Sequence, residues 1–191
     1  MQTIDNIVFD DVIFPRANLL AALLYQMDGV PIAVPLPHAH LMSFIEVFRN
    51  TNTCQNHIIA NNQKEIKLFV HQNNMQWLFE NSFVDTVPQL AKINIFCSSP
   101  GSKAFWSTYT QRYRRIIEQP ILYNELNFQL LLFGCKHIKQ LCECPEFSGD
   151  NSIRNRLNED FRNISEALAS ILLQNITNLN GQIRLSEEAQ Y

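Results

Sequence analysis

The chain is poor in glycine and in segments that direct a protein into or across a membrane. It has 5 glycines in 191 residues, and it lacks both a phosphate-binding loop and a dinucleotide fingerprint, so tight backbone contact with a nucleotide is not expected. The N-terminus, MQTIDNIVFDD, carries acids where a signal peptide has a basic start and an apolar run. No apolar stretch approaches the roughly 20 residues of a membrane span. We therefore expect a cytoplasmic protein without a membrane partner.

Charged residues are also few, and the cysteines follow no regular spacing. Charged residues make up 17% of the chain and the net charge is -3, which gives no electrostatic reason to expect a nucleic-acid partner. The five cysteines lack the spacing of a disulfide framework, and a reducing environment is the simplest interpretation. The apolar fraction of 46% in 191 residues is enough for one domain with a sizeable core.

Strand and helix patterns alternate along most of the chain. The predicted strands are 6–10, either 31–36 or 43–48, 66–71, 92–98 and 114–119. The predicted helices between and after them include 15–27, 100–113 and 121–144. This alternation predicts an α/β fold in which about five mainly parallel strands carry helices on both faces, as in flavodoxin-like and receiver-like domains.

A regular amphipathic stripe follows the linker PEFSGDN. Its apolar residues are Ile153, Leu157, Phe161, Ile164, Leu168, Ile171 and Leu172. We expect an α/β domain over 1–145, a helix over 150–176 and a loose tail over 177–191. The helix either packs on the domain or pairs with another chain, and a homodimer through 152–172 is one form of the second alternative.

The start of the chain and its predicted strand ends resemble the receiver domain of response regulators. Asp10 and Asp11 end the first predicted strand, and Pro120 follows the fifth. In that family an acidic pair binds magnesium, an aspartate ending strand three accepts phosphate, a Ser or Thr ends strand four, and a lysine precedes the strand-five proline. The resemblance thus implies a magnesium role for Asp10 and Asp11, and it implies that the site residues meet at the carboxyl ends of the strands.

Two positions depart from the receiver pattern. Ser98 supplies the hydroxyl, but His71 stands where the phosphate acceptor belongs, and Gln119 replaces the lysine. The resemblance therefore implies a degenerate receiver that has lost aspartyl phosphorylation. A narrower stretch, 87–117, is similar to a strand–helix–strand unit in N-terminal α/β modules of large invertebrate multidomain proteins, from which no catalytic residue can be transferred.

Three further groups of residues carry chemical possibilities. Cys97, Ser98 and Ser99 precede a helix, where a nucleophile can stand, although a buried thiol with a capping serine is the simpler interpretation. Zinc-type ligands occur at Cys135, His137, Cys142 and Cys144, without a standard spacing. Arg112, Arg114 and Arg115 lie beside Tyr109 and Tyr113, where they either contact phosphate or complement a helix dipole.

We expect from these patterns a non-catalytic protein-interaction or signalling module of the pseudo-receiver type. We expect a protein partner and no cofactor, with Mg²⁺ at Asp10 and Asp11 as the alternative. The alternative function is a small-molecule-binding or hydrolytic α/β enzyme that uses the strand-end residues Asp10, His71 and Ser98. The two differ in one feature, which is whether those three side chains converge.

Overall fold

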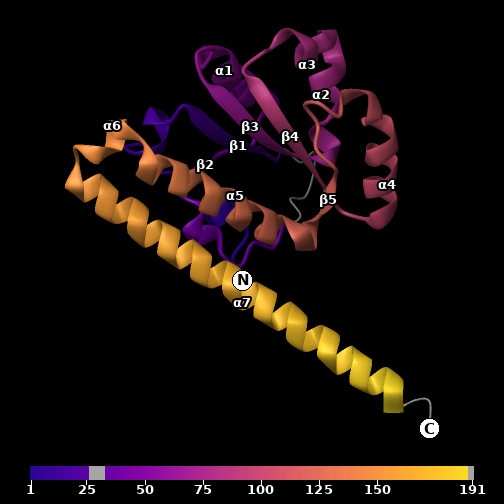
Figure 1. Ribbon diagram of the computed structural model, residues 1–191. Coiled ribbons are helices and arrows are strands. Elements are labelled where there is room, and N and C mark those ends of the chain that lie inside the picture. Colours follow the sequence, from indigo (N-terminus) through magenta and orange to yellow (C-terminus); the bar gives the residue numbers. More distant parts are fainter. Residues whose placement is uncertain (26–32, 189–191) are drawn as a thin grey trace. The chain divides into compact units, whose positions relative to one another are not determined.

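The computed structural model describes residues 1–25 and 33–188. The chain divides into two compact units, Met1–Asn127 and Phe128–Tyr191, so the division comes before the boundary expected near 145. The first unit holds a five-stranded parallel sheet with the order β2-β1-β3-β4-β5 (Figure 1). This is the strand order of flavodoxin-like folds, and the predicted fold class is confirmed.

The first unit contains the strands, the short helices and the start of α5. The strands are β1 (Leu19–Leu24), β2 (Ile45–Phe48), β3 (Glu65–His71), β4 (Leu90–Cys97) and β5 (Ile121–Leu122). The helices are α1 (Thr51–Ala60), α2 (Gln76–Phe79), α3 (Phe83–Thr86) and α4 (Pro100–Tyr109), and α5 (Tyr123–Glu143) begins here. Short 3-10 helices cover Ile4–Asn6, Phe14–Arg16, Ala39–Leu41, Gln72–Asn74, Glu80–Ser82 and Gln111–Tyr113.

Both faces of the sheet are buried. Leu20, Ala22 and Leu24 of β1 join a core cluster that includes side chains of α1, α2 and α3. The alternate residues, Ala21 and Leu23, are also buried although they point to the other face. A strand covered on both sides has no polar face, which explains why β1 is an unbroken apolar run.

The predictions for the first strand and the first helix are wrong. Residues 6–10 form no strand, and β1 occupies the middle of the predicted helix 15–27. The leucines at 19, 20, 23 and 24 fit helical spacing, but burial on both faces makes every position apolar and removes the two-residue period. As a result, Asp10 and Asp11 do not end a strand.

The remaining strand predictions have mixed outcomes. Predicted strands 66–71 and 92–98 correspond to β3 and β4, and the second strand is the 43–48 alternative, β2. The other alternative, 31–36, begins outside the described residues. The prediction of a strand at 114–119 is wrong, because Ile117 makes an isolated parallel bridge with Ile93 and the hydrogen-bonded strand starts after Pro120. Pro120 therefore precedes the fifth strand.

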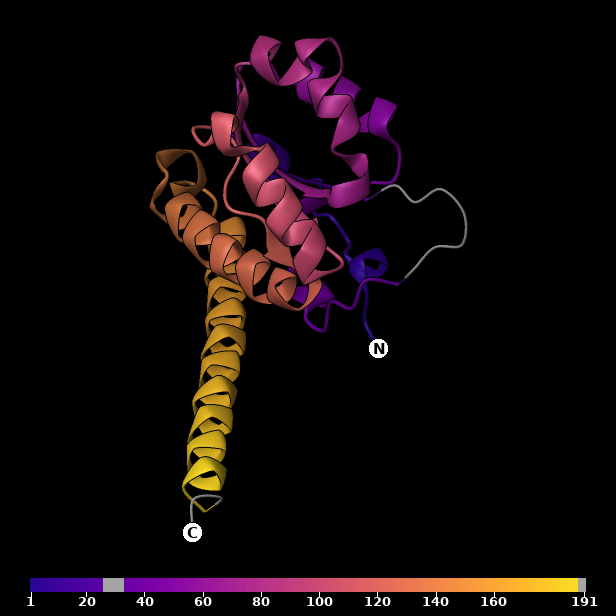
Figure 2. The ribbon, with the colours of Figure 1, turned by 90° about the vertical axis from the view of Figure 1, so that its right-hand side faces the viewer.

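The second unit consists of the rest of α5, the single-turn α6 (Pro145–Ser148) and the long helix α7 (Asn151–Glu188). Figure 2 shows α7 as one unbroken helix, so it continues through most of the tail that was predicted to be loose. Ile153, Leu157, Ile164 and Leu168 are buried, whereas Leu172 is exposed. Among the described residues, no helix combines the length and apolar character that a membrane span requires.

Candidate functional site

The carboxyl ends of the central strands gather an aromatic cluster around His71. Tyr25 follows β1, His71 ends β3, Phe96 lies near the end of β4, and Tyr123 follows β5. The His71 ring centroid lies 5.3 Å from that of Tyr25, 5.4 Å from that of Phe96 and 5.6 Å from that of Tyr123. These four residues form the strand-end cluster, at the edge where open α/β sheets bind their ligands.

Both nitrogens of the His71 ring are engaged. Nδ1 accepts the backbone N–H of Asn73, so in the neutral ring the proton is on Nε2, which is hydrogen-bonded to the Tyr123 hydroxyl. Burial lowers the pKa of His71 to about 4 and raises the pKa of Tyr123 to about 12. Both side chains are therefore neutral at pH 7, and the imidazole has no lone pair left to act as a base.

Cys97 and Ser98 lie at the same edge without an activating group. Cys97 is buried, and burial raises the pKa of its thiol to about 11 against the opposing charge of Lys103, so the nucleophilic thiolate is disfavoured. The Ser98 hydroxyl accepts from the Gln72 amide at 2.9 Å, and its backbone N–H donates to the same side chain at 3.1 Å. Ser99 caps α4 by accepting the N–H of Ser102, which matches the capping interpretation.

The structure brings two of the five predicted site residues together. His71 and Ser98 stand at neighbouring strand ends, linked through Gln72. Asp10 lies away from this edge, because its N–H donates to the carbonyl of Ser43, which precedes β2. Its carboxylate accepts the N–H groups of Val12 and Ile13 and thereby caps the following turn. Asp11 is exposed beside it.

Gln119, the fifth of those residues, lines a pocket beside α4.

The zinc-type residues do not converge either. In residues 1–25 and 33–188, no group of three or more His, Cys, Asp or Glu side chains is placed to hold a metal ion. His137 is instead buried against the ring of Phe133 at 5.4 Å between centroids, and burial lowers its pKa to about 4.

A second feature is an aromatic ridge along α4. Phe105 and Tyr109, one turn apart, are 58% and 48% exposed, and their rings stack with centroids 5.7 Å apart. Trp106 and Phe79 each meet Tyr109 edge to face at 5.5 and 5.6 Å. Phe79 also contacts Tyr113 at 5.2 Å. We call these five residues the aromatic ridge.

The ridge stands on a helix that contributes little to the core. No residue of α4 is buried, and Trp106 is partly buried against the core cluster. The helix is also held by Lys103, whose ammonium lies 2.8 Å from the Glu125 carboxylate. That carboxylate accepts the N–H of Leu122 as well, and the hydrogen bond from Lys103, with this second one, lowers the pKa of Glu125. Large exposed rings on a firmly held helix are typical of protein interfaces.

The chain segment that carries four of the five ridge residues is basic. Residues 98–117 contain Lys103 and three arginines but no acidic residue. Lys103 is paired with Glu125, whereas Arg112, Arg114 and Arg115 form no ion pair with any residue that the structure describes. The Arg112 guanidinium lies over the Tyr113 ring, 4.8 Å from its centroid. Because α4 ends at Tyr109, these arginines follow the helix rather than complete its last turn.

Four residues of the two clusters were not predicted from the sequence, and the reasons can be identified. Tyr25 and Tyr123 were missed because β1 was taken for a helix and the fifth strand was placed too early. Phe105 and Tyr109 carry a signal, since two aromatic residues four apart in a helix share one face. Their exposure has no sequence signature, because an aromatic stripe is usually buried.

Comparison of the chain with protein-family models, with curated proteins and with solved structures gives no significant match.

Proposed function

We propose that this protein is a non-catalytic protein-interaction module with a receiver-like fold. In this proposal its strand ends do not undergo aspartyl phosphorylation. The position of the phosphate acceptor is held by His71, which is neutral and hydrogen-bonded through both ring nitrogens. Nearby Cys97 and Ser98 lack a general base, so the chemistry present at this edge favours a structural role.

The single observation that carries the proposal is the exposure of Phe105 and Tyr109 on the aromatic ridge. Leaving such rings in water is unfavourable, and interfaces concentrate Tyr, Trp and Phe in their centres. Arg112 and Arg115 form no ion pair with any described residue, and they provide positive charge beside the ridge. The occupant is therefore a partner segment with acidic residues and one or two apolar anchors.

A selection from a random peptide display library on the full chain tests this proposal. We expect enriched peptides that combine Asp or Glu with aromatic or aliphatic residues. Selection on the Phe105→Ser, Tyr109→Ser double variant should lose them. The double variant Leu172→Ser, Leu173→Ser is a matched control, because it removes exposed apolar side chains from α7 and should keep the enrichment. Failure to enrich any peptide, or enrichment that ignores the ridge, contradicts the proposal.

A further inference from the structure

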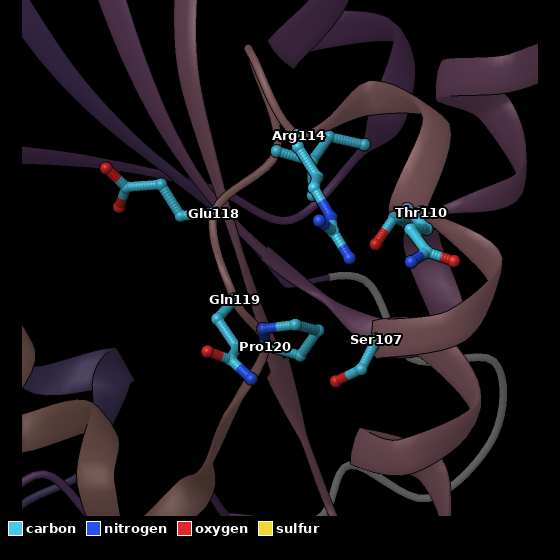
Figure 3. Close-up of a pocket in the computed structure, with 8 residues that line it drawn as sticks. Ser107, Thr110, Arg114, Glu118, Gln119 and Pro120 are labelled. Carbon is cyan, nitrogen blue, oxygen red and sulfur yellow. The ribbon is translucent and has the colours of Figure 1, made fainter.

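A pocket of about 400 Å³ lies beside α4, on the side away from Phe105 and Tyr109. It is lined by the C-terminal half of α4, by the turn that follows, and by the segment that leads into β5 (Figure 3). Ser107 is two positions from both Phe105 and Tyr109, which places it roughly 200° around the helix from them. Two buried residues, Ile117 and Pro120, provide apolar surface.

Arg114 is the one cation that lines the pocket, and it forms no ion pair with another described residue. In Figure 3 the Arg114 side chain extends toward Thr110, while Glu118 points to the opposite side. Glu118 is already bound to the Lys67 ammonium at 3.0 Å. Burial alone would raise the pKa of Glu118, but hydrogen bonds from Lys67 and Asn94 and the charges of Lys67 and Lys92 hold it below its usual value. Arg114 forms no ion pair within the described part of the chain and is free for an oxyanion.

Two hydroxyl groups of the pocket already use their protons. The Ser107 hydroxyl donates to the Lys103 carbonyl at 2.8 Å, and the Thr110 hydroxyl donates to the Trp106 carbonyl at 2.6 Å. With their protons committed, both oxygens offer lone pairs. They lie at the C-terminal end of α4, where the helix dipole is negative. The helix dipole opposes a doubly charged phosphate more strongly than a single carboxylate, and an N–H donor beside that carboxylate can use the two hydroxyl oxygens.

We propose that this pocket binds the carboxyl-terminal residue of a peptide. The carboxylate pairs with Arg114, the adjacent amide N–H donates to the hydroxyl oxygens of Ser107 or Thr110, and an aliphatic side chain rests on Ile117 and Pro120. A free carboxylate and its amide N–H occur together at every peptide C-terminus. The site goes beyond the proposed function and does not depend on it, because Phe105 and Tyr109 lie on the side of α4 away from Ser107.

Titration of the full chain with N-acetylleucine and with N-acetylleucinamide, followed by amide chemical shifts, tests the proposal. We expect saturable chemical-shift changes at residues 107–119 with the acid. The amide should bind at least about tenfold more weakly than the acid, since one charge-assisted pair is lost. Arg114→Gln should weaken binding of the acid by a similar factor. Arg115→Gln, a neighbouring exposed arginine outside the pocket lining, should leave it unchanged.

The remaining outcomes separate the possible occupants. A tripeptide ending in leucine should bind at least as tightly as N-acetylleucine. If N-acetylleucine binds and the tripeptide does not, the occupant is a small acid and the peptide proposal is overturned. Equal binding of acid and amide, or an Arg114→Gln variant with native chemical-shift dispersion and unchanged affinity, overturns it too. None of these results depends on Phe105 or Tyr109, so the proposed function is judged separately.

Discussion

His71 combines deep burial, a neutral ring and two hydrogen bonds. Burial opposes the protonation of the ring, and the protonated ring would also lose the bond that Nδ1 accepts from Asn73. His137 in the second unit is also buried, and burial lowers its pKa to about 4. Two buried neutral histidines connect the stability of the protein to pH.

The predicted pH dependence follows from the direction of these shifts. Burial lowers the pKa of His71 and of His137 to about 4, whereas an unfolded histidine titrates near about 6.5. Between these values the unfolded chain binds more protons than the folded chain. The free energy of unfolding therefore falls as pH drops from 6.5 toward 4, and the two neutral histidines cause no loss of stability above pH 6.5. The full loss is on the order of 3 kcal/mol per histidine and is reached near pH 4, and roughly 2 kcal/mol of it falls between pH 7 and pH 5. Urea unfolding from pH 7 to pH 5 measures it.

Matched variants show which residues cause the pH dependence of the free energy of unfolding. His71→Gln and His137→Gln should each flatten the dependence between pH 6.5 and pH 5, where the carboxyl groups contribute little. His40→Gln changes an exposed ring and should leave the slope as it is. An unchanged slope in the His71 and His137 variants would show that these rings are protonated in the folded state.

Ile95 tests the core at the same scale. It is completely buried in β4, between β3 and β5, as its position in the run KINIFCSS predicts. Ile95→Ala should lower the free energy of unfolding by roughly 2–5 kcal/mol, because a cavity is left in a packed interior. Ile59→Ala, at a position 51% exposed, should cost less than about 0.5 kcal/mol. A loss below about 1 kcal/mol at Ile95 would contradict a packed central strand.

At the scale of elements, the sequence predicts the regular parts of the fold and fails where two patterns overlap. The strands β3 and β4 were predictable because charged or amide residues bound their apolar runs. The run LLAALL of β1 is buried on both faces and therefore shows no alternation of apolar and polar residues. Its leucines fit helical spacing, so a helix was predicted where a strand forms. The misplaced first strand also misplaced the acidic pair, whose Asp10 proved to cap a turn.

The candidate site was predictable to the same partial extent. His71 and Ser98 were found because they follow correctly predicted strands. The pairing of His71 with Tyr123 joins residues 52 positions apart, and no local pattern encodes such a contact. The pocket at Gln119 likewise depends on where the chain turns before β5, which the expected strand at 114–119 concealed.

The two halves of the α7 stripe predict different results on truncation. Ile153, Leu157, Ile164 and Leu168 are buried, whereas Leu172, Leu173 and Ile176 are exposed. Removing 150–191 should bare the surface that the buried residues cover, at roughly 1.5–3 kcal/mol for each fully buried side chain, and leave an aggregation-prone protein. Removing 172–191 should preserve stability. Thermal unfolding and light scattering distinguish the two.

One outcome would reverse this interpretation of α7. If the chain without 150–191 stays monomeric, soluble and equally resistant to heat, intramolecular packing of the stripe is ruled out. Pairing with another chain, including a second copy through 152–172, would then be the role of the helix.

At the scale of the whole molecule, the strand ends and α4 have different roles in the proposal. The strand-end cluster is neutral and closed by mutual contacts, whereas the aromatic ridge presents exposed rings. The chain carries a net charge of -3, yet residues 98–117 contain four basic residues and no acidic one. The basic charge therefore accompanies the exposed rings, and an acidic partner would be directed to the ridge.

Small phosphodonors test the absence of receiver chemistry in the whole protein. Acetyl phosphate should give no acid-stable, base-labile aspartyl phosphate, because His71 stands at the acceptor position and Gln119 supplies no cation. Mass spectrometry under acidic conditions measures the product. A stoichiometric acyl phosphate on Asp10 or Asp11 would contradict the degenerate-receiver interpretation.

The most direct test of the central claim is the affinity of one selected acidic peptide, measured by calorimetry on the full chain. Replacing Phe105 and Tyr109 by serine should weaken binding by about 30-fold or more, since even one truncated interface anchor costs roughly 2 kcal/mol. Raising the salt concentration should weaken it further. The Leu172→Ser, Leu173→Ser control should bind like the natural chain. Equal affinity of the natural chain and the ridge variant would show that the partner binds elsewhere and would contradict the account.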